Sequence, residues 1–544
     1  MRRALLTVPI LLCWASAPET VTFKDSTARA GIGSIVVSGG PKKHYVLEVN
    51  GSGVCWIDYD NDGWMDLYLV NGATIENLQG TEPQRTTNHL YRNNRDGTFT
   101  DVTHKAGVPG HGWGFGCVAA DYDNDGYTDL FVTNFGPNIL YKNRGDGSFV
   151  DVTEKAGVGG GNLWHTGAAF GDYDLDGNLD LFVPGYLDFN AVKPELKTCE
   201  YRGVTVHACG PIGYKGSPDA LYHNNGDGTF TDVTTKANVA DKNLYFGFQA
   251  VFEDFDNDGW PDLFVGNDSN PNYLYRNKRD GTFEEVGITS GVAYSADGKE
   301  MSSMGIGVGD YDNDGNMDIF ITTFANDNYV LFHNDGAGLF TDVSYPSGVG
   351  EATVPHLGWA TFFFDYDNDG HLDILCANGH VYPEVDGAIR ESYRQPLQLF
   401  RNLGTGKFRE VTKEALNLPP QAARGGAFAD YNNDGRLGVA VSRIDAKPLL
   451  LANTGGRANW LRLKLTGTKC NRQAIGARVK VTAGGVTQYG SVRAGGSYLS
   501  SNDPRLHFGL GPASQAEIEV TWPGGGREKF SSVPANRQFD IRER

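Results

Sequence analysis

The 544-residue sequence lacks the short motifs that mark several common enzyme classes. It contains no Gly-x-Ser-x-Gly nucleophile elbow, no phosphate-binding glycine loop, no His-Glu-x-x-His helix and no Cys-x-x-Cys pair. Basic residues are also in deficit, with 47 Lys and Arg against 66 Asp and Glu and a formal net charge of -19. An acidic chain repels phosphate backbones and anionic lipid, so neither nucleic acid nor an anionic membrane is the expected partner.

Apolar runs long enough to cross a bilayer are absent, because the longest, from Ala4 to Trp14, falls short of the roughly 20 residues required. That run follows two arginines and precedes Ala15-Ser16-Ala17, a small-x-small cleavage site. Residues 1–17 therefore predict a signal peptide, and the mature protein is expected to be secreted, either periplasmic or extracellular. Cys13 follows the large residue Leu12, which disfavours lipid attachment.

The most informative pattern is Asp-x-Asp-x-Asp-Gly-x-x-Asp, which occurs six times. The copies begin at Asp58, Asp121, Asp172, Asp254, Asp310 and Asp365. Glycine at the sixth position permits a sharp turn that brings the four carboxylates together, and hard oxygen ligands select a hard divalent cation. A plain turn needs no such repeated quartet. Flexible all-protein oxygen cages favour Ca²⁺ over Mg²⁺, so about six calcium ions are the expected cofactors.

Each proposed site uses the Asp residues at loop positions 1, 3, 5 and 9 and the backbone carbonyl at position 7. The predicted metal ligands are Asp58, Asp60, Asp62, Trp64, Asp66, Asp121, Asp123, Asp125, Tyr127, Asp129, Asp172, Asp174, Asp176, Asn178, Asp180, Asp254, Asp256, Asp258, Trp260, Asp262, Asp310, Asp312, Asp314, Asn316, Asp318, Asp365, Asp367, Asp369, His371 and Asp373. An EF-hand is the alternative, but it requires a Glu at position 12 and flanking helices. Position 12 holds Leu69 in the first loop, within an apolar run typical of a buried strand.

The sequence around the loops repeats as well. A Gly-rich strand precedes each loop, and Asp-Leu-Phe-Val, Leu-Tyr-x-Asn and Gly-x-Phe-x-Asp-Val-Thr strands or close variants follow it. Four-stranded units repeated seven times predict an all-β, seven-bladed β-propeller over residues 18–455. The seventh unit is irregular, because Asp430, Asn432 and Asp434 remain but Gly438 replaces the last Asp. We leave open whether this loop binds metal and expect weak binding or none.

The seventh unit also lacks its fourth strand. The segment from Thr22 to Ile32 resembles that strand, so we expect the N-terminus to complete the seventh blade. Residues 456–544 carry no repeat signature, and Leu461–Leu465 and Ile518–Trp522 alternate apolar with polar residues. They predict a second domain, a small β-sandwich.

Six cysteines remain without Cys13. Cys199 and Cys209 lie close together in a long insertion of the third blade, and in an oxidising compartment they predict a disulfide. Cys55, Cys117 and Cys376 fall on predicted core strands, where we expect buried apolar thiols. Cys470 could be free.

The Phe-Gly strand that leads into each acidic loop resembles the FG-GAP repeats, also called VCBS-like repeats, of integrin α-subunit propellers. Residues 456–544 resemble an ASPIC/UnbV domain through the phrases beginning at Ala474, Gly496, Leu506 and Trp522. Together they resemble the cartilage acidic protein family. This resemblance implies a secreted calcium-binding propeller with an adhesion or matrix role and no firmly assigned catalysis. No integrin-like inserted domain is present, so integrin-type recognition does not carry over.

Residues just before the innermost strands should gather at one mouth of the central channel. The candidate ligand-binding residues are His111, Trp113, Trp164, His165, Tyr245, Glu300, His356, Trp359 and Arg424. Their aromatic rings could stack on sugars, and the histidines could bind a transition metal or move protons. The preferred alternative is that these side chains plug the funnel or cap the inner strands with hydrogen bonds. We therefore expect a binding or adhesion module for an extracellular protein or glycan, with a polysaccharide lyase-like, carbohydrate-active enzyme as the alternative.

Overall fold

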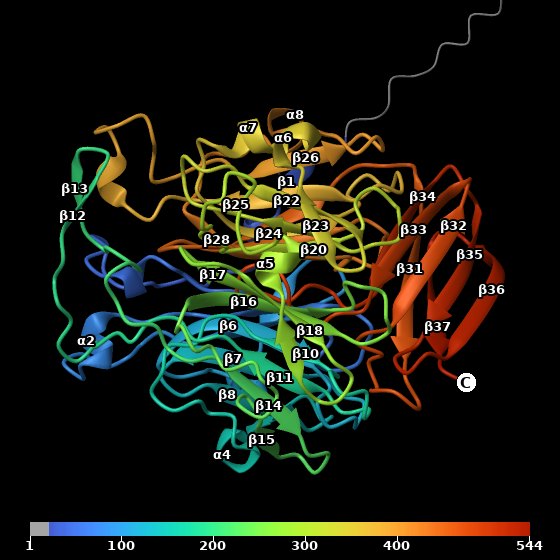
Figure 1. Cartoon of the computed structure of the whole chain (residues 1–544), viewed down its shortest axis with the longest axis horizontal. Helices are drawn as coiled ribbons and strands as arrows, with labels where there is room; N and C mark the ends of the chain where they lie inside the picture. Colours follow the sequence, from blue (N-terminus) through green and yellow to red (C-terminus); the bar gives the residue numbers. More distant parts are fainter. Residues whose placement is uncertain (1–20) are drawn as a thin grey trace, which may run out of the picture.

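Strands make up most of the regular structure in the computed structural model, which describes residues 21–544. The predicted signal peptide and Cys13 lie outside this range. Seven four-stranded antiparallel sheets occupy residues 23–453, and a C-terminal unit of two further sheets follows. The all-β class and the propeller architecture predicted from the sequence are confirmed (Figure 1).

In six of the sheets the chain runs through four strands from the innermost outward. Their strands are β2 (Val54–Ile57), β3 (Asp66–Leu69), β4 (His89–Asn93) and β5 (Phe99–Asp101); β6 (Trp113–Ala120), β7 (Asp129–Phe135), β8 (Ile139–Asn143) and β9 (Phe149–Asp151); β10 (Ala169–Gly171), β11 (Asp180–Val183), β14 (Ala220–Asn224) and β15 (Phe230–Asp232); β16 (Phe246–Glu253), β17 (Asp262–Asp268), β18 (Tyr273–Asn277) and β19 (Phe283–Glu285); β20 (Ile306–Gly309), β21 (Asp318–Ile321), β22 (Val330–Gly336) and β23 (Leu339–Asp342); and β24 (Gly358–Phe364), β25 (Asp373–Asn378), β26 (Gln398–Asn402) and β27 (Phe408–Glu410).

The remaining sheet joins the two ends of the propeller. It contains β28 (Ala423–Ala429), β29 (Gly438–Arg443) and β30 (Leu449–Asn453), and its outermost strand is β1 (Phe23–Asp25) from the N-terminus. Phe23 lies opposite Asn453 in this antiparallel pair. The innermost strands contact one another in the cyclic order β2, β6, β10, β16, β20, β24, β28 and back to β2. The sheets therefore form a closed ring with no exposed inner edge.

Helices are short and lie at strand ends or in insertions. They are α1 (Thr27–Ala30), α2 (Ile75–Leu78), α3 (Thr103–Ala106), α4 (Thr153–Ala156), α5 (Gly287–Ser290), α6 (Ser344–Ser347), α7 (Val349–Thr353) and α8 (Thr412–Ala415), with 3-10 turns at Val46–Glu48 and Pro383–Val385. The Asp-Val-Thr signature explains why a helical turn follows the outer strand. In the first blade, the Asp101 carboxylate accepts hydrogen bonds from both the backbone N–H and the hydroxyl of Thr103.

A buried Asn at the end of each third strand joins neighbouring sheets. Its Nδ2 donates to a backbone carbonyl in the preceding blade, at the second position of that blade's acidic loop. The seven pairs are Asn93 and Tyr431, Asn143 and Tyr59, Asn224 and Tyr122, Asn277 and Tyr173, Asn334 and Phe255, Asn402 and Tyr311, and Asn453 and Tyr366. The Leu-Tyr-x-Asn repeat thus supplies one inter-blade hydrogen bond at every junction around the ring.

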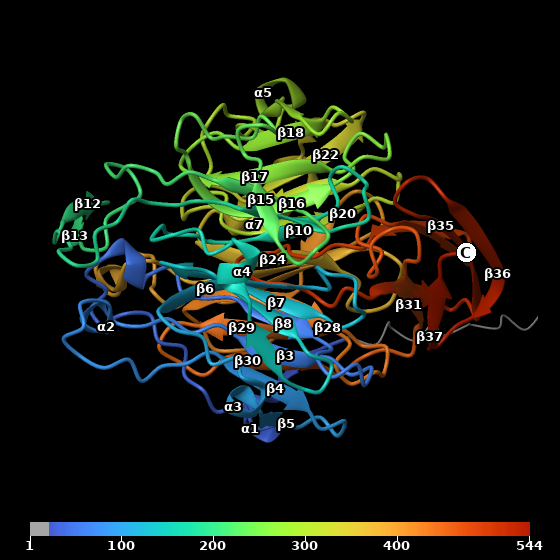
Figure 2. The ribbon, with the colours of Figure 1, turned by 90° about the horizontal axis from the view of Figure 1, so that it is seen from below.

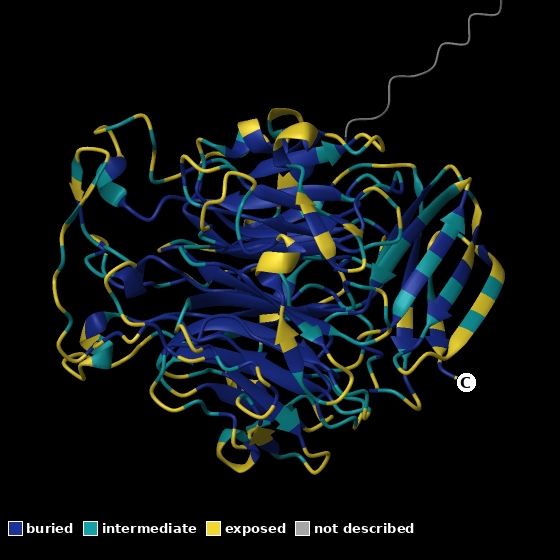
Figure 3. Ribbon diagram, viewed as in Figure 1, coloured by how far each residue is buried: buried dark blue, intermediate teal, exposed yellow. Residues whose placement is uncertain are grey.

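The C-terminal unit has two sheets packed on one face of the propeller (Figures 1 and 2). One contains β34 (Leu506–Gly511), β31 (Asn459–Thr466) and β37 (Arg537–Arg542), and the other contains β33 (Val486–Ser491), β32 (Arg478–Ala483), β35 (Gln515–Thr521) and β36 (Arg527–Pro534). Buried residues alternate with exposed or half-buried ones along β35, the pattern of a sheet with one face toward solvent (Figure 3).

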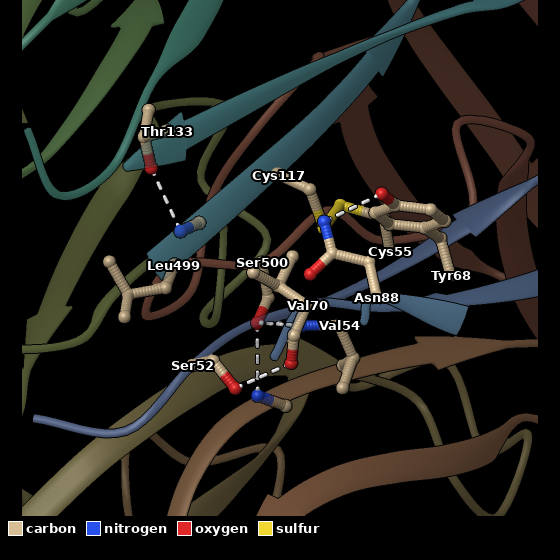
Figure 4. The surroundings of a disulfide bond; sticks show 12 residues. Ser52, Val54, Cys55, Tyr68, Val70, Asn88, Cys117, Thr133, Leu499 and Ser500 are labelled. Carbon is tan, nitrogen blue, oxygen red and sulfur yellow. Dashed lines mark hydrogen bonds between the residues drawn. A yellow bond between two sulfur atoms is a disulfide. The ribbon is translucent and has the colours of Figure 1, made fainter. Parts of the chain in front are cut away.

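The segment between β33 and β34 enters the centre of the propeller. We call residues 494–503 the plug. The Ser501 N–H donates to the Val54 carbonyl and the Trp56 N–H donates to the Ser501 carbonyl, so the plug pairs with β2. The Ser500 hydroxyl oxygen accepts from the N–H groups of Val54 and Gly426 (Figure 4). The Gly-Ser-Tyr-Leu-Ser phrase therefore fills the channel where the blades converge.

Two disulfides are present among the described residues. Cys199 is bonded to Cys209 in the third-blade insertion, at the hairpin of β12 (Cys199–Tyr201) and β13 (Val204–Val206). Cys55 on β2 is bonded to Cys117 on β6, so our expectation of free thiols at these two positions is wrong (Figure 4). Innermost strands of adjacent blades approach closely near the axis, and the two Cα atoms lie 6.1 Å apart. Cys376 is a buried free thiol as expected, and Cys470 is also free.

Candidate functional site

The acidic loops lie at the ends of the innermost strands, and strands flank each one. In the first loop, β2 ends at Ile57 and β3 begins at Asp66, so the helix-flanked EF-hand alternative is wrong. Gly63 has a φ of +83°, the left-handed conformation that the sharp turn demands. Its N–H donates to Asp58 Oδ2, and the N–H of Trp64 donates to Asp62 Oδ1. These bonds fold the loop back on itself and direct the aspartates inward.

The fourth loop position adds a link between loops. In most repeats this residue is an Asn with positive φ whose amide donates to the next loop. The pairs are Asn61 and Gly126, Asn124 and Gly177, Asn257 and Asn316, Asn313 and Gly370, Asn368 and Gly435, and Asn433 and Gly63. Leu175 replaces this Asn in the third loop. The loops therefore form a nearly continuous ring on one face of the propeller.

Four of the six complete loops, those beginning at Asp58, Asp121, Asp172 and Asp365, contain buried carboxylate oxygens without a hydrogen-bond partner among the described residues. Ligand atoms of Asp58, Asp60 and Asp62 lie within 4.8 Å of one another, as do those of Asp121, Asp123 and Asp129. Asp58 Oδ1 and Asp60 Oδ1 are buried without a hydrogen-bond partner among the described residues. The same is true of Oδ1 in Asp123, Asp172, Asp174 and Asp367. Such orphaned oxygens are costly unless a cation binds them, so these acidic clusters fit a metal ion.

The pKa values of aspartates in these loops show the same electrostatic cost of burying unpaired carboxylates. Burial raises the pKa of Asp121 to about 6 and that of Asp172 to about 8, and in Asp172 neighbouring aspartates add to the effect. Burial also raises the pKa of Asp310 to about 8 and that of Asp254 to about 6. A bound divalent cation would favour the charged forms and reverse these shifts.

A basic residue lies beside each complete loop and was not among the site residues predicted from the sequence. It is the variable residue of the Leu-Tyr-x-Asn strand, namely Arg92, Lys142, His223, Arg276, His333 and Arg401 in the six repeats. Arg92 Nε lies 3.0 Å from Asp60 Oδ2, and Arg401 Nη2 lies 2.9 Å from Asp369 Oδ2. Arg92 and Arg401 contact Oδ2 of the third-position residues Asp60 and Asp367, and Oδ1 of both aspartates has no hydrogen-bond partner among the described residues. The recurrence of the basic residues at one repeat position was the signal available in the sequence.

The seventh loop is built differently. Gly438 replaces the last Asp, and a Cβ atom there would lie 2.3 Å from the Tyr431 ring. Ala452 stands where the other repeats have a basic residue. Instead, Arg462 from β31 of the C-terminal unit places Nη1 2.6 Å from Asp430 Oδ2, and both side chains are buried. A guanidinium group thus provides the positive charge that this loop requires.

Other contacts attach the C-terminal unit to the ring of acidic loops. Arg505 Nη1 donates to the Gly63 carbonyl, and Gln473 Oε1 accepts from the Asp121 N–H. His507 Nε2 lies 2.6 Å from Asn368 Oδ1. The face that carries the proposed metal sites is therefore the face on which the C-terminal unit docks.

The nine candidate ligand-binding residues differ widely in burial. His111 and Glu300 are exposed, whereas Tyr245 and His356 are half-buried. Trp113, Trp164 and His165 are buried, and burial lowers the pKa of His165 to about 4. Trp359 and Arg424 do meet, with the guanidinium carbon 4.2 Å from the centre of the indole ring.

Arg424 is fully buried and serves a structural role at this position. Its guanidinium donates to the backbone carbonyls of Val49, Gly379, Ala423 and His380. Trp359 packs against Tyr498 at the tip of the plug, with ring centres 4.9 Å apart. The plug therefore fills the inner part of the mouth where we expected a ligand.

The FG-GAP-like repeat family matches residues 58–132, 121–183, 254–321, 310–376 and 382–441, which together are more than half of the chain. The chain belongs to this FG-GAP-like repeat family. The ASPIC and UnbV family matches residues 467–544. The repeat matches agree with the loops and strands described above, and the second match covers most of the C-terminal unit, including the plug.

Among curated proteins, this FG-GAP protein is similar to cartilage acidic protein 1 of Homo sapiens, with 29% identity over 276 residues. It is 28% identical over 272 residues to cartilage acidic protein 1 of Xenopus tropicalis. Each match covers 48% of this chain, and 39% and 40% of the two relatives respectively. The chain thus matches about two fifths of these relatives' length.

Among solved structures, an Agrocybe aegerita lectin that recognises non-reducing terminal N-acetylglucosamine covers 72% of this chain and 85% of its own, with 15% identity and a TM-score of 0.37. A rhamnogalacturonan lyase covers 81% of this chain and 77% of its own, with 14% identity and a TM-score of 0.36. At these TM-scores the likeness says nothing about function.

Proposed function

We propose that this protein is an exported, calcium-loaded propeller that acts as a binding or adhesion module for an extracellular ligand. The observation that supports calcium most directly is the set of buried, unpartnered carboxylate oxygens in the acidic loops. Oxygen ligands at the spacing of these loops suit Ca²⁺. Each ion would be held by the aspartates at positions 1, 3, 5 and 9 with the carbonyl at position 7.

Export is supported by the N-terminal sequence and by the two disulfides, which persist in oxidising compartments. Among residues 21–544, no helix is long and apolar enough to cross a membrane. The similarity to cartilage acidic protein 1, which covers 48% of this chain, agrees with the family resemblance on which the binding proposal draws.

Calcium stoichiometry and thermal stability test this function. The mature protein, purified and dialysed against calcium, should contain about six Ca²⁺ per chain. Binding of ions to the folded state alone adds about 2.7 kcal/mol per site when free calcium is a hundredfold above Kd. Chelation should therefore lower Tm, and calcium should restore it.

Asp123→Asn is the informative variant because Asp123 Oδ1 is among the unpartnered oxygens. It should remove one bound ion and leave the other sites filled. Glu284→Gln, an exposed substitution on β19, is the matched control. A protein without alkaline-earth metal, or one whose Tm ignores the chelator, would refute the calcium proposal.

A further inference from the structure

A cavity of about 290 Å³ opens on the face of the propeller opposite the acidic loops. The innermost strands begin on this face and end at the acidic loops, as β24 does between Gly358 and Phe364. The third-blade insertion covers the cavity, and Figures 1 and 2 show its hairpin β12–β13 far from the C-terminal unit. Ile212 of the insertion lies at the rim and is 80% exposed.

The insertion is fixed in place across the mouth. The Ala208 N–H donates to the His44 carbonyl, and the Tyr201 hydroxyl donates to Glu391 Oε2 at 2.7 Å. His207 Nδ1 lies 2.8 Å from Glu384 Oε1. The Cys199–Cys209 disulfide closes the insertion on itself. The cavity therefore has a pre-formed roof, which reduces the entropy lost when a ligand binds.

Six aromatic residues line the cavity. They are Tyr186, Tyr201, Phe248, Phe324, Trp359 and Tyr382. At the inner end, Tyr498 of the plug packs against Phe248 and Trp359. The plug thus separates the cavity from the face that carries the acidic loops. The cavity has room for about one sugar ring.

Two buried polar side chains of the cavity lining, Asp268 and Asn50, both lie next to the Tyr186 hydroxyl. Asp268 lines the cavity, and its Oδ2 accepts from the Tyr186 hydroxyl at 2.8 Å. Asn50 also lines the cavity next to Tyr186, and its Nδ2 has no hydrogen bond of acceptable geometry within residues 21–544. Asn50 is 2% exposed, and its Nδ2, which approaches the Tyr186 hydroxyl without a well-formed hydrogen bond, can donate to a ligand in the cavity.

The polar groups select among ligand classes. A hydroxyl group can accept from Asn50 Nδ2 and donate to Asp268 at the same time, whereas an ammonium group would leave Asn50 unpaired. Arg424, whose charge lies against Trp359, opposes a second cation there. Among the described residues, the lining contains Asp268 and Asp327 but no Lys or Arg, which disfavours a uronate or a sulfated sugar.

We propose that this cavity binds one neutral pyranose, a single uncharged sugar ring, between aromatic walls with its hydroxyls on Asn50 and Asp268. This inference rests on the proposed binding function and narrows its ligand to an uncharged glycan terminus. It also argues against a lyase that cleaves acidic polysaccharides at this site, because no basic lining residue faces a uronate carboxylate.

Calorimetric titration of the full calcium-loaded chain tests the proposal. The probes are the methyl glycosides of glucose, galactose and mannose, with glucuronate and tetramethylammonium as charged comparators. At least one neutral glycoside should bind saturably with one site per chain. Asp268→Asn should weaken it at least tenfold, whereas the exposed control Glu284→Gln should leave it unchanged. Glycoproteins ending in the same sugar would show whether the ligand is free or attached.

Trp359 provides a second readout that does not depend on the Asp268 variant. Sugar binding should change the intrinsic fluorescence, and Trp359→Phe should remove that change. Preferential binding of either charged comparator, equal affinity in Asp268→Asn, or no binding of any neutral glycoside would overturn the pyranose proposal. If no neutral glycoside binds but calcium still raises Tm, only the pyranose proposal is wrong. If calcium does not change Tm, the proposed calcium-loaded module is wrong as well.

Discussion

Arg462 Nη1 lies 2.6 Å from Asp430 Oδ2, and this contact joins the C-terminal unit to the one acidic loop that has lost its final Asp. Burial raises the pKa of Asp430, and Arg462 opposes that shift. In the six complete loops, a basic residue from the same blade accompanies the carboxylates. In the seventh loop, Ala452 occupies the position of that basic residue, and Arg462 of the C-terminal unit supplies the positive charge. The degenerate loop is thus a docking point.

Arg462→Gln should destabilise the protein by about 3 kcal/mol or more, because it leaves the Asp430 carboxylate buried with less compensating charge. Urea unfolding of the calcium-loaded chain measures this loss. Combining it with Asp430→Asn should recover part of the stability, since the uncompensated charge is gone. Strictly additive effects of the two substitutions would contradict a direct pairing. Calcium content should stay at about six ions in both variants.

The buried inter-blade asparagines should be much more sensitive than exposed ones. Asn334 Nδ2 donates to the carbonyls of Phe255 and Met317, and its Oδ1 accepts from the Gly336 N–H. Asn334→Ala should therefore cost about 2–3 kcal/mol in urea unfolding, because buried backbone groups lose their partners. Asn225, which contacts Thr229 on the surface, is the matched control. Asn225→Ala should change stability by less than about 0.5 kcal/mol, and equal losses would refute the proposed role of Asn334.

Local spacing explains why so much of the fold could be predicted. A loop such as Asp58 to Asp66 carries its own turn, carboxylates and flanking strands within a few residues, and it repeats. The Cys55–Cys117 bond could not be read in this way, because it depends on how closely β2 and β6 approach at the axis. The position of the plug could not be predicted from the sequence either. Nothing in the local pattern around Tyr498 indicates that it packs on Trp359, which is 139 residues away by numbering.

The candidate ligand-binding set shows the same limit. Trp359, which belongs to that set, lies inside β24 and lines the cavity, at a position that the repeat defines. Asp268 and Asn50 were missed, since one ends a second strand and the other precedes the first blade. Their meeting depends on the closure of the ring. The basic residues of the third strands were visible in the sequence, at one fixed position of each repeat.

His165 should make stability depend on pH. Burial lowers its pKa to about 4, below the ordinary value of 6.5. Between these values the unfolded chain binds more protons than the folded one, so stability should fall as the pH is lowered. From pH 7.5 to 5 this amounts to about 2 kcal/mol. Urea unfolding in excess calcium measures it, and His165→Asn should lose about 2 kcal/mol less than wild type over that interval. An identical pH dependence in the two proteins would show that His165 is not the group responsible.

The two disulfides should differ in how much they stabilise the protein. Cys55–Cys117 spans 62 residues and Cys199–Cys209 spans 10. In the chain-entropy description, closing these loops stabilises the fold by about 4 and about 2.7 kcal/mol respectively. Replacing both cysteines of a pair by alanine and unfolding the calcium-loaded protein in urea measures each contribution. The larger loss should follow removal of Cys55–Cys117, which links the first two blades beside the plug. Losing the insertion's bond should instead weaken binding at the aromatic cavity with a smaller stability cost. The reverse order of stability losses would contradict a role for Cys55–Cys117 in holding the ring together.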